Sequence, residues 1–444
     1  MNGRVFFIIV HDRRLVTCQF FVWTIVIVLL TGCRVPDPPV LKDKRQGVIY
    51  DTAMEAEIRG GKAPPIVTTA FSRYVDTLAE PVAITGWTDS TCRWEIFVAT
   101  NRDRLQPDGD SLDGESRPID QPRFGRADVM LPRQKRGSEP KMSAVRKPIG
   151  LFSVTGKRGA AEDQIATAKS VPLPEADFLD GINEQLARSR EQDLLLFVHG
   201  FNVSFDSAVI RTAQIALDMP FNGAVVAYCW PSQGGVFKYA TDEPINKKSV
   251  APFVAFLTAL RAGVPAETRI NIVVHSMGNR IVMEALHEMA QASPPGTGSN
   301  PRKPFANVAL CAPDVGRSDF EMWAPGVVSQ ADRVTLYANS SDTALIASKQ
   351  LHQERRAGDA WEPETAPGIE TIDCSRIDLT LMGHSYYGSN TDVLSDLFML
   401  LKEDLPAARR PHLTRLPTDS GDSLFQFSAT APALNVTWHF EDRQ

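Results

Sequence analysis

The stretch INIVVHSMGNRIVMEAL, residues 270–286, changes from a strand pattern to a helix pattern within one short span. Residues 270–274 form a mainly β-branched apolar run, which is typical of a strand covered on both faces. From Gly278 onward, apolar residues recur at helical spacing. The sequence therefore predicts a buried strand that runs directly into a helix, with Ser276 at the junction.

A serine at such a junction can project its hydroxyl above the end of the sheet. The N–H of the next residue, Met277, then lies at a helix N-terminus, where it can face an oxyanion. This arrangement resembles the nucleophile elbow of α/β-hydrolases, whose usual pattern is G-x-S-x-G. Val274 stands where the first glycine would be, so the match is partial. The resemblance makes Ser276 a candidate nucleophile, and the alternative is ordinary packing at a strand–helix junction.

Strand and helix patterns alternate from Asp193 onward, which predicts a mostly parallel central sheet with helices on both faces. The resemblance noted above implies that this sheet has the α/β-hydrolase fold. In such sheets, ligands bind at the carboxyl ends of the strands. The expected strands are residues 194–198, 224–230, 270–274, 308–312, 334–338 and 369–372. Earlier strands, expected to form an antiparallel edge, are residues 94–102, 127–131 and 149–155, with a long loop over 103–122.

The strand at residues 194–198 ends in His199-Gly200-Phe201-Asn202. In α/β-hydrolases a second oxyanion donor comes from the loop after an earlier strand, often introduced by His-Gly. By this resemblance the N–H of Phe201 is the second donor, and Gly200 lets the chain approach closely. The His199 side chain is expected to support the loop rather than to react.

A serine hydroxyl becomes a good nucleophile when an imidazole takes its proton. Of the 8 histidines, His384 lies between the last strand and the last helix of the alternation. The catalytic histidine of α/β-hydrolases occupies that loop, so the resemblance favours His384 as the base. A histidine in an ordinary surface loop is the alternative.

Five motifs together resemble a bacterial, esterase- or lipase-like and uncharacterised branch of the α/β-hydrolase superfamily. They are residues 199–202, 230–232, 275–279, 337–342 and 383–385. The resemblance extends over about residues 94–405. It implies the fold and serine-hydrolase chemistry but no particular substrate.

Two aspartates follow strands between Ser276 and His384, namely Asp314 and Asp342. The family most often carries its acid after the strand that precedes the histidine-bearing one, which implies Asp342, with Asp314 as the alternative. The chain order Ser276, Asp342, His384 matches that of α/β-hydrolases.

The strand at residues 224–230 ends in Trp230-Pro231-Ser232 and is expected to open into a loop that runs to about Lys248. Trp230 and Tyr239, which lies in this loop, are candidate walls of the acyl pocket. For Trp230, a place in the core is an equally good interpretation.

Residues 1–32 resemble a bacterial lipoprotein signal, because two arginines precede a mainly apolar run that ends in Leu30-Thr31-Gly32-Cys33. Lipidation is expected at Cys33, and an uncleaved transmembrane anchor is the alternative. Both interpretations place the rest of the chain outside the cytoplasm. The first predicts a membrane-anchored lipoprotein of the cell envelope that faces the periplasm or the outer membrane.

The remaining chain divides into a tether at residues 33–93, the hydrolase domain at 94–405 and a C-terminal tail at 406–444, with one possible strand at 435–440.

A hydrophobic content of 43% permits a sizeable core, and a net charge of −6 argues against nucleic acid as a partner. No C-x-x-C pair or other metal-ligand spacing stands out, and no G-x-G-x-x-G follows a strand. We therefore expect no metal and no cofactor.

These patterns predict a serine hydrolase that cleaves a carboxylic ester or thioester through an acyl-enzyme on Ser276. Its substrate would be a small-molecule or lipid-like acyl compound. One alternative is an acyltransferase with the same triad. The other is a non-catalytic envelope lipoprotein that uses the fold for binding.

Overall fold

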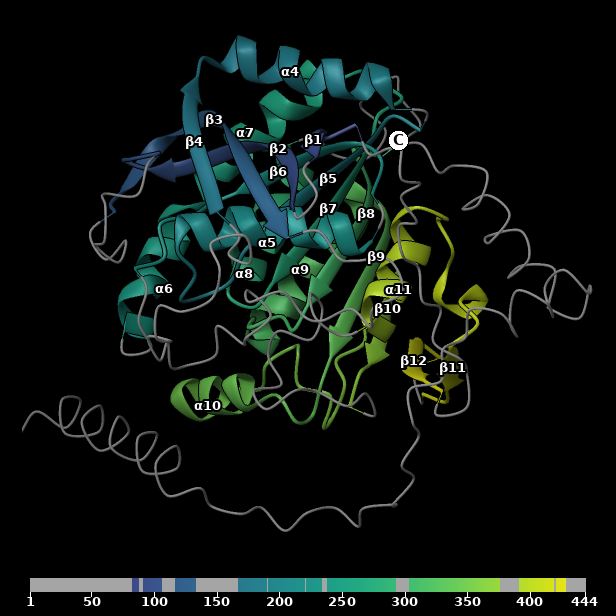
Figure 1. Ribbon diagram of the computed structural model, residues 1–444. Coiled ribbons are helices and arrows are strands. Elements are labelled where there is room, and N and C mark those ends of the chain that lie inside the picture. Colours follow the sequence, from purple (N-terminus) through teal and green to yellow (C-terminus); the bar gives the residue numbers. More distant parts are fainter. Residues whose placement is uncertain are drawn as a thin grey trace, which may run out of the picture.

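The centre of the protein is one twisted sheet of twelve strands, in the order β11-β12-β10-β9-β8-β7-β5-β6-β2-β3-β4 with β1 paired to β2 (Figure 1). The computed structural model describes residues 82–87, 91–105, 116–132, 167–189, 191–219, 221–233, 238–292, 303–375, 391–418 and 421–428. Helices cover both faces of this mostly parallel sheet, so the predicted fold class is confirmed.

Six parallel strands form the middle of the sheet, and each of them corresponds to one of the strands expected from the alternation. They are β5 (Asp193–Val198), β6 (Ala224–Tyr228), β7 (Arg269–His275), β8 (Phe305–Cys311), β9 (Ala331–Ala338) and β10 (Ile369–Asp373). Val274 of β7 pairs with Val198 on one side and with Leu310 on the other. Because the strands are parallel, their carboxyl ends meet at one edge of the sheet.

The predicted antiparallel edge is present, and it is longer than expected. Its strands are β1 (Ile84–Trp87), β2 (Thr91–Arg102), β3 (Pro118–Pro132) and β4 (Thr167–Leu173). The prediction of a loop over 103–122 is wrong at its end, because β3 begins at Pro118. Pro118 and Pro122 precede Phe124, where pairing with β4 starts, so both prolines lie where β3 has β2 as its neighbour. The strand expected at 149–155 lies outside the described residues.

At the opposite edge the sheet continues into the predicted C-terminal tail. The 3₁₀ helix η5 (Ala407–Arg409) leads to β11 (Leu413–Leu416) and β12 (Ser423–Phe427), and β12 runs parallel to β10. The sheet therefore includes part of the predicted tail. Buried Asp396 holds this part of the chain, because its carboxylate accepts from Arg410 at 2.5 Å and lies 2.8 Å from His412 Nε2. The possible strand at 435–440 lies outside the described residues.

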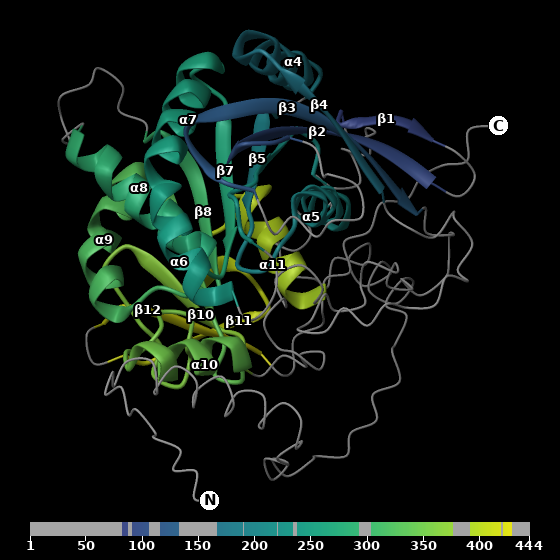
Figure 2. The same cartoon turned by 90° about the vertical axis from the view of Figure 1, so that its left-hand side faces the viewer.

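The helices form a layer on each face, which Figure 2 shows edge-on. One layer consists of α5 (Phe205–Asp218) and α11 (Thr391–Leu401). The other consists of α4 (Glu175–Arg188), α7 (Val250–Gly263), α8 (Gly278–Ala292) and α9 (Arg317–Gln330). Two separate apolar clusters, one on each face, fill the space between these helices and the sheet. Within the described part of the chain, none of the helices has the length and apolarity needed to cross a membrane.

Two short helices, α6 (Tyr239–Lys248) and α10 (Thr343–His352), lie toward the carboxyl edge of the sheet (Figure 1). The expectation of a loop up to Lys248 is therefore wrong. The buried residues of α6 are polar, namely Asp242 and Asn246. A helix with a polar buried face lacks the apolar periodicity by which helices are recognised in a sequence.

Candidate active site

Ser276 lies in the turn between β7 and α8, where its backbone has a φ of 52°, in the left-handed region. A non-glycine residue in this region is strained and persists where its surroundings hold it. The N–H of Ser276 donates to the carbonyl of Cys311 at 3.0 Å. The carbonyl of Ser276 accepts from the backbone N–H of Asn279 at 3.0 Å and from its side-chain amide at 2.8 Å. These bonds fix the turn that presents Ser276.

Val274 occupies the position of the usual first glycine and packs, fully buried, in the core on the α8 face. Glycine is needed at two other places, where this turn meets the loop after β5. A Cβ on Gly278 would lie 2.4 Å from the carbonyl oxygen of His199. A Cβ on Gly200 would lie 2.7 Å from the Cβ of Ser276. The two glycines therefore permit the close approach of the two turns.

The loop after β5 is anchored at its beginning by His199 and Trp230. Their rings stack with centroids 5.3 Å apart, and the indole N–H of Trp230 donates to the His199 carbonyl at 2.8 Å. Burial, with a further contribution from Arg102, lowers the pKa of His199 to about 3. His199 is therefore neutral near pH 7, as suits a residue that supports the loop. Trp230 is completely buried beneath this loop.

The same loop is anchored at its end by Asn202, whose backbone is also left-handed, with a φ of 57°. The N–H of Asn202 donates to Ser232 Oγ at 2.9 Å. Ser232 Oγ in turn donates to Asp242 Oδ2 at 2.6 Å, and the N–H of Gln233 donates to Asp242 Oδ1 at 2.9 Å. Phe201 lies between the two anchors, and its ring contacts that of Tyr239 at a centroid distance of 5.2 Å.

The two predicted oxyanion donors are thus placed on turns that lie against each other. Among the described residues, neither the N–H of Phe201 nor that of Met277 has a hydrogen-bond acceptor. The carbonyl of Met277 accepts from the side-chain amide of Asn246 at 3.1 Å. Both N–H groups can therefore serve an oxygen atom of a bound molecule.

Asp314, the alternative acid, is the centre of a buried polar network. Its carboxylate accepts from Tyr239, from Ser348 at 2.6 Å and from Arg280 at 3.2 Å, and Arg356 Nε lies 3.4 Å away. Burial alone would raise the pKa of this carboxyl. The two arginines and the hydrogen bonds outweigh burial and lower the pKa to about 2. The hydroxyl of Tyr239, a predicted pocket residue, is engaged in this network.

Asp342, the favoured acid, follows β9 and caps α10. Its Oδ1 accepts from the N–H groups of Ala344 at 3.0 Å and Leu345 at 3.1 Å, and the side chain is fully buried. β8 is the one strand between β7, which carries Ser276, and β9, so both residues lie at the carboxyl edge of the sheet. His384 lies outside the described residues, in the segment between β10 and α11.

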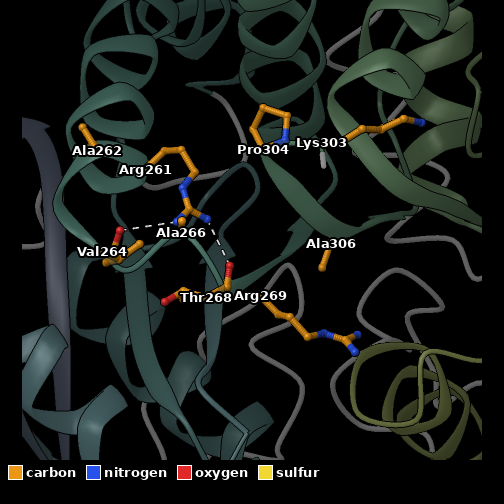
Figure 3. Close-up of a pocket in the computed structure, with 9 residues that line it drawn as sticks. All are labelled: Arg261, Ala262, Val264, Ala266, Thr268, Arg269, Lys303, Pro304 and Ala306. Atoms are coloured by element: carbon orange, nitrogen blue, oxygen red, sulfur yellow. Dashed lines mark hydrogen bonds between the residues drawn. The ribbon is translucent and has the colours of Figure 1, made fainter. Parts of the chain in front are cut away.

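A cavity of about 360 Å³ lies at the other edge of the sheet, where β7 and β8 begin (Figure 3). Its cationic side chains already have partners within the protein, and Arg269 pairs with Asp193 and Asp404, each at 3.5 Å. Arg261 donates to the carbonyls of Thr268 and Val264, and Lys303 donates to those of Val328 and Ala331. The length of β7 separates this cavity from Ser276, so it is not the catalytic pocket. No group of three or more potential metal ligands occurs among the described residues.

The prediction from sequence assigned no role to three polar residues that the structure connects to the site, namely Ser232, Asp242 and Asn246. Ser232 belongs to a motif that was noted for its tryptophan. Asp242 and Asn246 follow Tyr239 at spacings that put all three on one side of a helix. This spacing is the signal by which they can be found.

A parallel sheet that carries a serine in a left-handed turn between a strand and a helix, beside a His-Gly loop, defines an α/β-hydrolase. The chain belongs to the family described as "Alpha/beta hydrolase of unknown function (DUF900)", whose model matches residues 175–402. The predicted superfamily is thereby confirmed. A comparison with curated proteins finds no significant match.

Solved structures that are similar to this chain include three esterases. Esterase B from Lactobacillus rhamnosis is 12% identical, with a TM-score of 0.33, over 79% of this chain and 94% of that one. Esterase PF2001 from Pyrococcus furiosus is 13% identical, with a TM-score of 0.29, over 55% and 87%. A hyperthermophilic esterase from Pyrobaculum calidifontis is 9% identical, with a TM-score of 0.29, over 80% and 98%. The family assignment rests on residues 175–402 and not on these scores.

Proposed function

We propose that the protein is a serine hydrolase that cleaves a carboxylic ester or thioester through an acyl-enzyme on Ser276. The observation that carries this proposal is the left-handed Ser276 at the carboxyl end of β7. A nucleophile held in this way can reach a carbonyl carbon while the N–H of the following residue faces the carbonyl oxygen.

In the proposed reaction, His384 takes the proton of the Ser276 hydroxyl, and the serine oxygen attacks the substrate carbonyl. The N–H groups of Met277 and Phe201 bind the oxyanion of the tetrahedral intermediate. His384, oriented by Asp342, then gives its proton to the leaving alcohol or thiol. Water, deprotonated by His384, attacks the acyl-enzyme, releases the carboxylic acid and restores the Ser276 hydroxyl.

Asp342 is the proposed acid because the carboxylate of Asp314, the alternative, is already bonded to other side chains. The Asp314 carboxylate balances Arg280 and Arg356 and accepts two hydroxyl hydrogen bonds. To orient an imidazole, the Asp314 carboxylate would have to give up one of these partners. The position of Asp342 after β9, one strand before the segment with His384, also agrees with the chain order of α/β-hydrolases.

The proposal is tested by comparing the wild-type protein with Ser276→Ala on p-nitrophenyl butyrate and on a fluorophosphonate probe. We expect hydrolysis and labelling in the wild-type protein and neither in the variant. Adding a competing alcohol separates a hydrolase from an acyltransferase, because a transferase makes the new ester at the expense of the free acid. A folded wild-type protein that the probe does not label would favour a binding role for the fold.

We also propose that the protein is a membrane-anchored lipoprotein of the cell envelope, with the lipid on Cys33. The support for this proposal is the sequence of residues 1–33. The test is incorporation of a labelled fatty acid in a bacterial host. We expect incorporation in the wild-type chain and none in Cys33→Ser, and equal incorporation in both chains would refute it.

A further inference from the structure

Helix α6 buries polar side chains where most helices bury apolar ones. Asp242 is fully buried and Asn246 is 2% exposed. Together with Tyr239 they are spaced so that all three share one side of the helix. Buried polar groups are nearly always hydrogen-bonded, so their partners show what the helix is fastened to.

The first contact fastens α6 to the loop after β5. Asp242 accepts from Ser232, and Ser232 accepts from the N–H of Asn202, with distances of 2.6 and 2.9 Å. Asn202 directly follows Phe201. On the other side of Phe201, two residues earlier, the indole N–H of Trp230 donates to the carbonyl of His199 at 2.8 Å. The peptide that carries the Phe201 N–H is bonded at its own carbonyl, that of Gly200, to His199 Nδ1 at 2.8 Å. The peptides before and after it are bonded to Trp230 and Ser232, and the bond to Ser232 is the one that leads to α6.

The second contact fastens α6 to the turn after β7. The side-chain amide of Asn246 donates to the carbonyl of Met277 at 3.1 Å. Met277 is the residue whose N–H is the other proposed oxyanion donor. One helix is thus linked to both turns, to the first through Ser232 and to the second directly, from positions one turn apart along its axis.

Further contacts fix α6 itself against the rest of the fold. The ring of Tyr239 lies against that of Phe201, and its hydroxyl donates to Asp314. Glu243 accepts from Arg280 of α8 at 2.7 Å and lies 2.6 Å from Nε2 of His352 in α10. The helix therefore cannot shift without breaking several buried bonds at once.

We propose that α6 is a brace that sets the spacing of the two oxyanion donors, with Ser232, Asp242 and Asn246 as positioning residues. This inference rests on the proposed function. An oxyanion hole works when its donors are preorganised at the place where negative charge develops. Loss of either link lets one donor drift, which weakens binding of the transition state more than binding of the substrate.

The kinetic test uses Ser232→Ala, Asn246→Leu and the double variant, with p-nitrophenyl butyrate as substrate. We expect kcat to fall by about 10- to 100-fold in each single variant, with KM changed by less than about threefold, because a complete oxyanion donor is worth about 10²- to 10³-fold. Since residues that act as a unit are non-additive, the double variant should lose less than the product of the two single effects.

The matched control is Ser189→Ala. Ser189 is also buried, and its hydroxyl donates to the carbonyl of Asn222 at 2.8 Å, near the start of β6 and away from the site. We expect a similar fall in thermal midpoint for Ser189→Ala and Ser232→Ala. In the control, kcat should stay at the wild-type value.

Hydrogen exchange of residues 199–204 gives a readout that does not need turnover. Loss of the Ser232 acceptor should speed exchange of the Asn202 N–H by about tenfold, the effect of one buried hydrogen bond. The Ser189→Ala control should leave this exchange unchanged.

Each outcome decides the proposal. Unchanged exchange in Ser232→Ala would overturn the brace as a structural device. Faster exchange with unchanged kcat in an active enzyme would overturn its role in catalysis. If the wild-type protein neither hydrolyses the ester nor reacts with a fluorophosphonate, the proposed function fails, and the exchange data decide the brace alone.

Discussion

Asn279 holds the backbone of Ser276 from two positions. Its side-chain amide and its backbone N–H donate to the same Ser276 carbonyl, at 2.8 and 3.0 Å. The side-chain amide also reaches the carbonyl of Cys311 at 3.3 Å, and Cys311 in turn accepts from the Ser276 N–H. Asn279 is fully buried, so solvent does not compete for these bonds. One side chain therefore ties together the strained turn and the neighbouring strand.

Replacing Asn279 by alanine should allow the backbone turn at Ser276 to move, because the side-chain bonds to the Ser276 and Cys311 carbonyls are lost. We expect kcat to fall about 10- to 100-fold, since a displacement of about 1 Å can cost 10²-fold. Asn307→Ala is the control, because Asn307 is also fully buried and its amide donates to Asn271 at 2.8 Å, near the start of β8. Both variants should lose about 1–3 kcal/mol of stability. Equal kcat in the two variants would contradict the role given to Asn279.

Asp342→Asn should lower kcat by about 10⁴-fold, the effect seen when the acid of a Ser-His-Asp triad becomes an amide. Because asparagine caps helices as well as aspartate does, α10 should keep its cap and the protein most of its stability. Steady-state kinetics together with the thermal midpoint measure both effects. Asp314→Asn should retain turnover. The reverse pattern, with Asp314→Asn inactive and Asp342→Asn active, would exchange the roles of the two acids.

Asp314 should instead govern stability in acid. Its pKa in the folded state is about 2, below the ordinary value of 3.8 for this carboxyl group. A lowered carboxyl pKa gives stability that is complete above about pH 4 and is lost as the pH falls through 2, in total about 2 kcal/mol. Denaturant unfolding between pH 2 and 7 measures this. The difference in unfolding free energy between wild type and Asp314→Asn should shrink in that window, and a constant difference would contradict the account.

His199→Phe should keep an aromatic ring stacked on Trp230 and remove the imidazole, which is the group that can take up a proton. The folded pKa of His199 is about 3 and its ordinary value is 6.5, so the unfolded chain binds a proton first as the pH falls. Stability is therefore complete above pH 6.5 and declines toward pH 3. The variant should show a flatter stability profile in this window. Because phenylalanine also removes the bond between His199 Nδ1 and the Gly200 carbonyl at 2.8 Å, kcat should fall by about 10- to 100-fold. Complete loss of hydrolysis would indicate that the His199 imidazole itself reacts.

The parallel strands and the turn at Ser276 could be predicted because their signals are local. β7 is a continuous buried apolar run, and α8 has regular apolar spacing, so the junction between them is visible in residues 270–286. The resemblance to α/β-hydrolases added the chain order of the candidate residues. The superfamily and the fold class predicted from these signals are confirmed.

The parts that could not be predicted depend on tertiary partners. β3 contains three prolines, at positions 118, 122 and 132, and all three lie outside Phe124–Met130, the stretch that pairs with β4. β11 and β12 are too short to show alternation, and their place is set by pairing with β10. The buried side of α6 is polar because its partners are Ser232 and the carbonyl of Met277. These partners are distant in the sequence, so the local residue pattern does not indicate them.

The most direct measurement of the central claim is peptide mapping by mass spectrometry after reaction with a fluorophosphonate. The account predicts a single phosphonyl group, attached to Ser276, in the wild-type protein. It predicts no adduct in Ser276→Ala and slow labelling at Ser276 in Asp342→Asn. An adduct on another serine, or labelling of Ser276→Ala at the wild-type rate, would contradict it.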